Sequence, residues 1–371
     1  MLLWLVLFAI SCGKTNDTQL VVSAALPVFS VDSLEIVIPE LPTDSILAFE
    51  TQKIIAPYDL VQTKDEKFWV SADRLEHQII LFDQLGSYLA ETGRKGKGPG
   101  EFEGATILHI GWDNDLYVLD SRLQRITQYE LSENQLNMVS SFSPSSSSEL
   151  STYYREIYVT EWGNFGVICT LIDYKTGEEE YSLVELDEEF KVKKRLLTMP
   201  GNEKMSLDRW NHVNHLAGKK TFWDLNGEWF YHVSSHNTVI NKYNVRTGKS
   251  TSLSHLLFED RRLTEEIRLE LLDVAYNMTE RSDKIHEAFV DVEVLPLFQD
   301  FMVYENHYYL VIYNPSGSES TELIRVNEIS GKIEFADIPL SLWKVKAGKQ
   351  MIYGTVTSGE DAQIRVIKFT D

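Results

Sequence analysis

A short dipeptide pattern recurs six times along this chain, and it restricts the fold more than any other feature. Each copy ends an apolar, strand-like run, and the copies are Phe82-Asp83, Tyr129-Glu130, Leu186-Asp187, Tyr243-Asn244, Val326-Asn327 and Phe369-Thr370. The steps between their second members are 47, 57, 57, 83 and 43 residues. Repeats of roughly 40 to 50 residues that contain several strands are typical of β-propeller blades. The sequence therefore predicts an all-β fold, a six-bladed β-propeller.

The residues upstream of the dipeptide keep the same spacing in three of the copies. A short polar residue is followed by Ile six positions later and by an aromatic residue nine positions later, at Asp73/Ile79/Phe82, Asp120/Ile126/Tyr129 and Ser234/Ile240/Tyr243. The polar side chain is suited to binding backbone amides where one strand turns into the next. The aromatic ring is expected to fill the space between neighbouring blades.

A glycine-rich, basic segment links the first two repeats and reads Gly-Arg-Lys-Gly-Lys-Gly-Pro-Gly-Glu-Phe over residues 93–102. Such a composition suits a phosphate, but the Gly-Lys-Ser/Thr ending of a P-loop is missing. We therefore interpret the segment as the crossover from an outer strand to the next inner strand, where glycine supplies unusual backbone angles.

Together with the strand motifs on either side, this segment resembles the six-bladed propeller lipoproteins of bacteria, which are similar to NHL-type propellers. The likeness is strong over residues 34–130 and looser beyond. The resemblance implies a propeller located in the bacterial cell envelope, and it supplies no catalytic motif.

The propeller is expected to span residues 32–371 and to be closed by an N-terminal strand. The last repeat contains only three candidate strands, so we predict that Leu34–Ile38 supplies the fourth. A helical insertion is predicted at about 260–290, between blades four and five, because apolar residues there recur at helical spacing. That face is Leu263, Ile267, Leu271, Val274 and Met278. The insertion is either a structural brace or a lid over a binding face.

The N-terminus carries the pattern of a targeting signal. Leu2 to Ile10 is an unbroken apolar run of signal-peptide length, too short to span a membrane, and Ser11-Cys12 follows it. This resembles the cleavage and lipidation site of bacterial lipoproteins. We predict a signal peptide over residues 1–11, lipidation at Cys12 and a lipid-anchored tether over residues 12–31. An ordinary cleaved signal is the alternative.

Charge and cysteine content limit the partners. The formal net charge of −21 argues against nucleic acid and against an anionic membrane surface, so the lipid anchor is the only membrane contact expected. The other cysteine, Cys169, lies in an apolar stretch and is predicted to be a buried strand residue rather than a nucleophile.

A binding face is predicted near Trp210, His212 and His215, beside the helical insertion. Tryptophan and histidine next to such an element suit a protein, peptide or carbohydrate ligand. Two close histidines could also hold zinc, and the presence of a metal or cofactor is left open.

A metal-assisted hydrolase or lyase of the gluconolactonase-like propeller type is the alternative function. Its metal would lie on the central axis, and Asp59, His109, Asp113 and Asp224 fall near suitable positions. The chain has no Gly-x-Ser-x-Gly, His-Glu-x-x-His or Cys-x-x-Cys motif. We therefore predict an envelope lipoprotein that binds a ligand, without catalytic activity.

Overall fold

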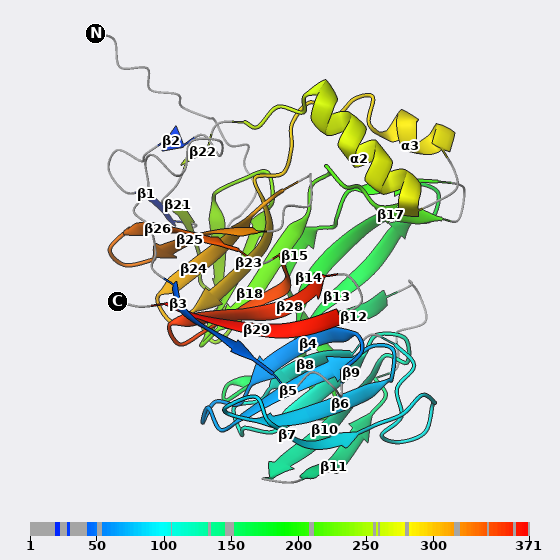
Figure 1. Cartoon of the computed structure of the whole chain (residues 1–371), viewed down its shortest axis with the longest axis vertical. Coiled ribbons are helices and arrows are strands. Elements are labelled where there is room, and N and C mark those ends of the chain that lie inside the picture. The colour runs from blue at the N-terminus through cyan, green and yellow to red at the C-terminus, as the bar shows by residue number, and fades with distance from the viewer. Residues whose placement is uncertain are drawn as a thin grey trace.

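A computed structural model describes residues 19–22, 28–29, 43–49, 54–104, 106–132, 135–144, 152–207, 211–254, 257–258, 260–278, 282–314, 320–339, 341–358 and 361–369. Six antiparallel sheets follow one another around a centre (Figure 1), each beginning with its inner strand. The predicted six-bladed β-propeller is therefore confirmed.

The first three blades each consist of four consecutive strands. Blade one is β4 (Pro57–Gln62), β5 (Phe68–Asp73), β6 (Gln78–Asp83) and β7 (Tyr88–Thr92); blade two is β8 (Thr106–Ile110), β9 (Leu116–Asp120), β10 (Arg125–Ser132) and β11 (Gln135–Phe142); blade three is β12 (Thr152–Thr160), β13 (Gly163–Asp173), β14 (Glu178–Leu186) and β15 (Val192–Pro200).

The other three blades include strands from the N-terminal part of the chain. Blade four is β18 (Thr221–Asn226), β19 (Trp229–Ser234), β20 (Ile240–Asn244) and β21 (Ser250–Ser254), with β1 (Gln19–Val22) parallel to β21; blade five is β23 (Phe298–Tyr304), β24 (His307–Ile312), β25 (Thr321–Asn327) and β26 (Ile333–Ile338); blade six is β27 (Leu342–Gly348), β28 (Met351–Ser358), β29 (Asp361–Phe369) and β3 (Thr43–Ala48).

Closure by an N-terminal strand is confirmed, but the strand differs from the predicted one. Thr43–Ala48 pairs antiparallel with β29 and takes the outer position of blade six. The predicted segment Leu34–Ile38 lies outside the described residues. Part of the expected tether is docked on the propeller, because β1 lies against blade four and β2 (Val28–Phe29) pairs with β22 (Leu257–Phe258).

Hydrophobic side chains hold each pair of neighbouring blades together. Within the described residues, six apolar clusters each join two consecutive blades, including the pair formed by blades six and one. The aromatic residues of the repeated pattern lie in these clusters, as predicted: Phe82 and Tyr129 are 0% and 1% exposed. The outer strand β11, by contrast, is largely exposed.

The repeated polar residues make the turns. Asp73 and Asp120, which end the second strands, each accept two backbone N–H groups of the following turn at 2.9–3.1 Å. The second residue of the closing dipeptide does the same in the next turn, as Asp83 and Asn244 show. The repeat is therefore visible in the sequence because each blade needs the same two turns.

Two insertions interrupt the blade pattern, and both connect the outer strand of one blade to the inner strand of the next. The first, between β15 and β18, carries the hairpin β16 (Lys204–Ser206) and β17 (His212–Asn214). The second contains α2 (Glu265–Met278) and α3 (Ser282–Ala288), which lie at the upper end of the molecule in Figure 1. The predicted helical insertion is thus confirmed, whereas the hairpin had no counterpart in the sequence prediction.

The two insertions pack on each other through a separate apolar cluster. It includes Met205 from the hairpin, Leu271 and Ala275 from α2, and Phe289 after α3. Val274, which the helical spacing placed on the buried face, is 43% exposed. Within the described residues, no helix is long and apolar enough to cross a membrane.

Candidate functional site

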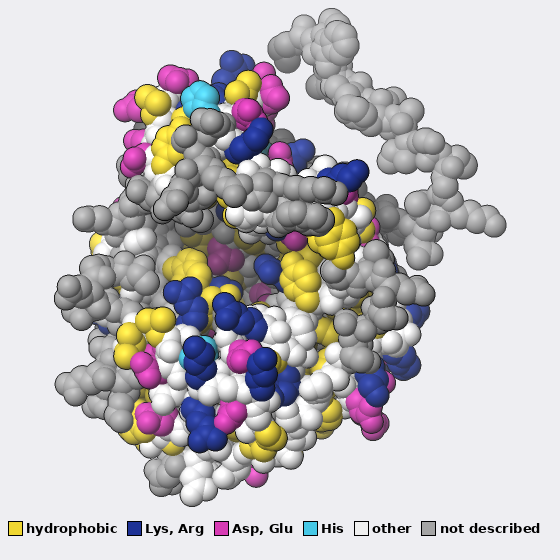
Figure 2. Space-filling model, turned by 90° about the vertical axis from the view of Figure 1, so that its right-hand side faces the viewer, with side chains coloured by type: hydrophobic (Ala, Val, Ile, Leu, Met, Phe, Trp, Pro, Cys, Tyr) yellow, Lys and Arg dark blue, Asp and Glu magenta, His cyan; other side chains and the backbone are white. Residues whose placement is uncertain are grey.

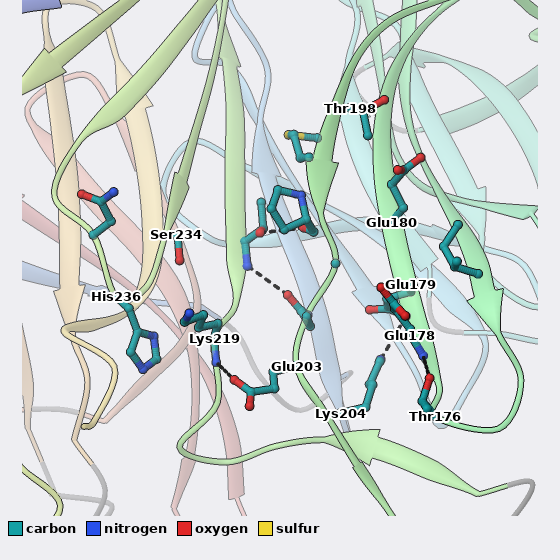
Figure 3. A pocket seen from close by; sticks show the side chains of 17 residues that line it. Thr176, Glu178, Glu179, Glu180, Thr198, Glu203, Lys204, Lys219, Ser234 and His236 are labelled. Carbon is teal, nitrogen blue, oxygen red and sulfur yellow. Dashed lines mark hydrogen bonds and ion pairs between the residues drawn. The ribbon is translucent and has the colours of Figure 1, made fainter. Parts of the chain in front are cut away.

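A cleft of about 1140 Å³ opens between blades three and four, beside the first insertion. Its walls come from β14, the end of β15, the connection over residues 201–204 and the end of β19 with its turn (Figure 3). The polar lining residues are Thr176, Glu178, Glu179, Glu180, Thr198, Asn202, Glu203, Lys204, Lys219, Thr221, Ser234, His236 and Asn237. Side chains from three separate segments therefore converge on one space.

The blade-three wall is acidic. Glu179 is buried and accepts hydrogen bonds from the Tyr181 hydroxyl at 2.6 Å and from the Cys169 thiol at 3.4 Å. Its carboxylate also lies 3.0 Å from the Lys204 ammonium. Burial alone would raise the pKa of Glu179, but the bonds from Tyr181 and Lys204 outweigh burial and lower it. Glu179 is therefore a fixed, ionised part of the wall.

The residues on either side of Glu179 project from the opposite face of the strand. Glu180 pairs with Arg195 at 3.2 Å. Glu178 is exposed, and within the described part of the chain its carboxylate has neither an ion pair nor a hydrogen bond. It is thus available to a ligand.

The first insertion forms the lower part of the cleft in Figure 3. The Glu203 carboxylate accepts the backbone N–H of Lys219 at 2.9 Å, and Asn202 accepts that of Thr221 at 3.0 Å. Gly201 starts the insertion directly against blade three, where a Cβ atom would lie 2.0 Å from the carbonyl oxygen of Glu179. Only glycine permits this approach.

The blade-four wall carries weaker, uncharged polar groups. His236 lies in the turn after β19, with Nδ1 3.0 Å from the Ser235 hydroxyl, and burial lowers its pKa. The cleft therefore places the acidic groups of blade three opposite neutral hydrogen-bonding groups of the β19 turn, with Lys204 and Lys219 between them on the first insertion. Its described lining contains no Phe, Tyr or Trp.

The histidines predicted to bind a ligand lie on the hairpin of this insertion. Nδ1 of His212 is 2.9 Å from the Ser206 hydroxyl, and Nε2 is 3.0 Å from the Tyr174 carbonyl oxygen. His215 is 3% exposed, with Nδ1 accepting the N–H of Ala217 and Nε2 3.0 Å from a carbonyl oxygen at the end of α3. Both rings fasten the insertions in place rather than line the cleft, and Trp210 lies outside the described residues.

Ionisable side chains from the inner strands also surround a central cavity of about 340 Å³. They are His109 (β8), Glu156 (β12), Asp224 (β18), Asp300 (β23), and Lys344 and Lys346 (β27). Asp59 (β4) pairs with Lys346 at 2.7 Å. Burial raises the pKa of Asp224 to about 6 and lowers that of His109 to about 3.

Most of these groups connect neighbouring blades. Asp59 accepts the N–H of Leu108 on the next inner strand at 2.8 Å, Asp224 accepts that of Val303 at 2.8 Å, and Nε2 of His109 accepts that of Val159 at 3.0 Å. Asp300 accepts the N–H of Val345 in the same way. These bonds explain the acidic residues within the inner strands, two of which, Asp59 and Asp224, the sequence had marked as candidate metal ligands.

The four candidate metal ligands are not brought together. Asp113 lies in the turn between β8 and β9, where it accepts the Tyr117 hydroxyl at 2.9 Å, while Asp59, His109 and Asp224 are bonded to different blades. Within the described residues, no group of three or more His, Cys, Asp or Glu side chains is placed to hold a metal ion.

The surface has no uniform sign despite the net charge of −21. Figure 2 shows a hollowed face on which basic side chains gather beside the hollow and acidic and hydrophobic side chains lie within it. The fold, the cleft and the central cavity together define a six-bladed β-propeller with a polar pocket between two blades.

Comparisons with known proteins agree with this class. The family described as the 6-bladed β-propeller matches residues 47–323, and the chain belongs to it. No curated protein sequence matches the chain.

Solved structures share the fold at low sequence identity. A Bacteroides fragilis protein provisionally classed as exported matches with a TM-score of 0.52 and 11% identity over 95% of this chain and 99% of its own. A member of the duf4221 family from Bacteroides vulgatus matches with a TM-score of 0.50 and 10% identity over 90% of this chain and 98% of its own. At such identities the likeness establishes the fold alone.

Proposed function

We propose that the chain is a lipoprotein of the bacterial cell envelope whose propeller binds a peptide with a basic side chain in the cleft between blades three and four. The cleft carries this proposal, because it is the place where polar groups from three segments converge without filling the space. Its volume of about 1140 Å³ exceeds that of most sites for single small molecules, which are about 300–1,000 Å³.

The charge of the cleft supports a basic group on the ligand. Four carboxylates and two lysines line it; Lys204 pairs with Glu179 and Arg195 pairs with Glu180, so Glu178 is the carboxylate left free for a ligand among the described residues. The peptide backbone could bond to the neutral wall formed by Ser234, His236 and Asn237. A carbohydrate is less suited to this cleft, because its described lining offers no aromatic face on which a sugar ring could stack.

The test is a titration of purified protein with fluorescently labelled octapeptides that differ only in a central Lys, Gln or Glu. We expect the Lys peptide to bind, and the Glu178→Gln/Glu180→Gln variant to lose about tenfold in affinity, with a smaller loss at high salt. Glu188→Gln/Glu189→Gln is the matched control, since both residues are exposed on a turn of the same blade at the other face. Equal binding of all three peptides, or equal losses in both variants, would refute the proposal.

The lipid anchor is supported by the apolar run that ends at Ser11-Cys12 and, more generally, by a structural relative classed as exported. In the intact cell, Cys12→Ala is expected to release the protein from membranes and to abolish labelling by a palmitate analogue. A wild-type protein that is unlabelled, or a variant that remains membrane-bound, would contradict lipidation at Cys12. The peptide titration does not depend on this outcome.

A further inference from the structure

A second cavity, which we call the vestibule, lies at the face opposite the cleft. It has a volume of about 490 Å³ and is lined by all six turns that connect an inner strand to the next strand of its blade. One residue from each turn is Lys64, Trp112, Trp162, Gly227, Glu305 and Lys349. The cleft is bordered instead by the connections between blades, so the two sites are separate.

Two tryptophans of the vestibule are exposed to solvent. Trp112 is 58% exposed and Trp162 is 37% exposed, although both lie in a fold whose other large side chains are mostly buried. They belong to neighbouring blades, and the backbone N–H of Trp112 donates to the carbonyl oxygen of Val159 at 3.0 Å, which fixes one turn to the next blade. The backbone N–H of Trp162 donates to the Thr160 hydroxyl at 3.1 Å. The rings are thus carried on fixed turns while their faces remain available.

Polar groups of both signs accompany these rings. Lys64 and Glu161 line the vestibule, and within the described residues neither side chain has an ion pair or a hydrogen bond. The vestibule shares His109, Leu225 and Tyr353 with the central cavity, so it continues inward toward Glu156. A ligand at the mouth would therefore meet aromatic faces and exposed charged groups of both signs side by side.

The combination of exposed aromatic rings with charged groups of both signs favours some classes of ligand over others. An organic cation would suit the aromatic rings, but the vestibule carries charges of both signs: Lys64 and Lys349 are accompanied by Glu66, Glu161 and Glu305, and Lys349 lies 3.8 Å from Glu66. Any charged ligand therefore meets a group of its own sign. A neutral molecule with many hydroxyl groups avoids both penalties and can donate to carboxylates and accept from lysines. The C–H groups on one face of a sugar ring pack well on the negative face of an indole.

We propose that the vestibule is a saccharide-binding site, in which a sugar ring stacks on Trp112 or Trp162 and its hydroxyls bond to Lys64 and Glu161. The site is independent of the peptide cleft. Its volume lies in the range of small-molecule pockets, about 300–1,000 Å³.

The experiment titrates the full-length protein, in detergent or with its lipid removed, with maltotriose, xylotriose, chitotriose and trigalacturonic acid. Tryptophan fluorescence and calorimetry report binding. We expect a neutral trisaccharide to bind with a Kd of about 1 mM or tighter. Trp112→Ala and Trp162→Ala are each expected to weaken it by about tenfold, and the corresponding Phe variants by less.

Trp343→Ala is the matched control, because Trp343 is 46% exposed but lies near the start of the inner strand β27, at the end away from the vestibule turns. It should leave the affinity unchanged, as should Glu178→Gln in the cleft. Circular dichroism and melting temperature confirm that each variant is folded. The proposal is overturned if none of the four trisaccharides binds, if only the charged one binds, or if binding survives both tryptophan replacements.

Discussion

The substitution Glu156→Gln tests an acidic side chain of the central cavity that, among the described residues, makes no hydrogen bond to a neighbouring blade. Asp59, Asp224 and Asp300 each accept a backbone N–H from the neighbouring inner strand. Among the described residues, the Glu156 carboxylate has no hydrogen bond and no ion pair. Burial is the main reason that its pKa rises from the ordinary 4.5 to about 7, and the Asp59 charge adds to the rise while Lys346 opposes it.

The sign of the effect on stability follows from the raised pKa. The folded protein holds the proton of Glu156 more tightly than the unfolded chain does, so the penalty is absent below pH 4.5 and grows as the pH rises toward 7. One pKa unit corresponds to about 1.4 kcal/mol, so the full penalty above pH 7 is at most about 3 kcal/mol. The Glu156 side chain is only partly buried, and screening by solvent reduces the figure.

Glutamine has the same shape and cannot ionise, so Glu156→Gln should remove the penalty. For a domain of this size the entropy of unfolding is about 0.7 kcal/mol per degree, and we expect the melting temperature at pH 8 to rise by up to about 4 °C. Near pH 4.5 the variant and the wild type should melt together. Glu130→Gln, an exposed change on blade two, is the control at both pH values.

Differential scanning calorimetry over pH 4.5–8 makes the measurement. A difference in melting temperature that does not change with pH would refute the titration argument, because a packing effect of Gln is independent of proton concentration. A lower melting temperature at pH 8 would show that the ionised carboxylate has a favourable partner in the cavity.

Two further predictions concern contacts that hold the fold together. Asp59→Asn leaves Lys346 without its ion pair, and because Asp59 is only 2% exposed we expect the free energy of unfolding, measured by denaturant titration, to fall by about 3 kcal/mol. If the further replacement Lys346→Met restores the stability, the unpaired ammonium is the cause of the loss. An unchanged free energy of unfolding in Asp59→Asn would contradict the role of the pair. His215→Ala removes two hydrogen bonds and the ring contact with Phe289 at 4.7 Å, so the free energy of unfolding should fall by about 1–3 kcal/mol. Limited proteolysis within residues 255–297 should become faster. An unchanged rate of cleavage would show that His215 does not hold the helical insertion in place.

The fold was predictable because its repeat depends on hydrogen bonds between residues close together in the sequence. Asp83 and Asn244 bind amides only two to four residues away, so the requirement for a polar residue recurs at the same point of each blade. The identity of the closing strand was not predictable in this way. Leu34–Ile38 and Thr43–Ala48 are both plausible strands, and pairing with β29, more than 300 residues away along the chain, leaves no local mark.

The candidate sites were harder to predict from the sequence, because they too depend on contacts between residues that lie far apart along the chain. The cleft combines residues near 178–180, 198–204 and 234–237, and no short motif spans those segments. Asp59 and Asp224 were singled out as candidate metal ligands near inner strands, and both lie on inner strands, but the backbone groups they bind lie 49 and 79 residues further on. A sequence pattern shows that an acid is present without showing whether it binds a metal or a neighbouring backbone. The exposure of Trp112 and Trp162 could have been suspected from the short turns that carry them.

The connection between blades three and four leaves a space open, whereas the connection between blades one and two fills the corresponding space. Between blades one and two, the glycine-rich segment folds on itself: the Glu101 carboxylate accepts the N–H of Gly98 at 2.7 Å and bonds Arg94, and Phe102, fully buried, enters the apolar cluster of the two blades. Arg94 is thus paired within the segment itself, which fits its interpretation as a crossover. Between blades three and four, the chain instead leaves through Gly201 to form the β16–β17 hairpin and returns at Thr221. The blades still adhere beneath this opening, since Tyr181 and Trp223 pack edge to face at 4.9 Å. An open polar pocket can therefore be kept at this junction without weakening the apolar contact that holds the propeller closed.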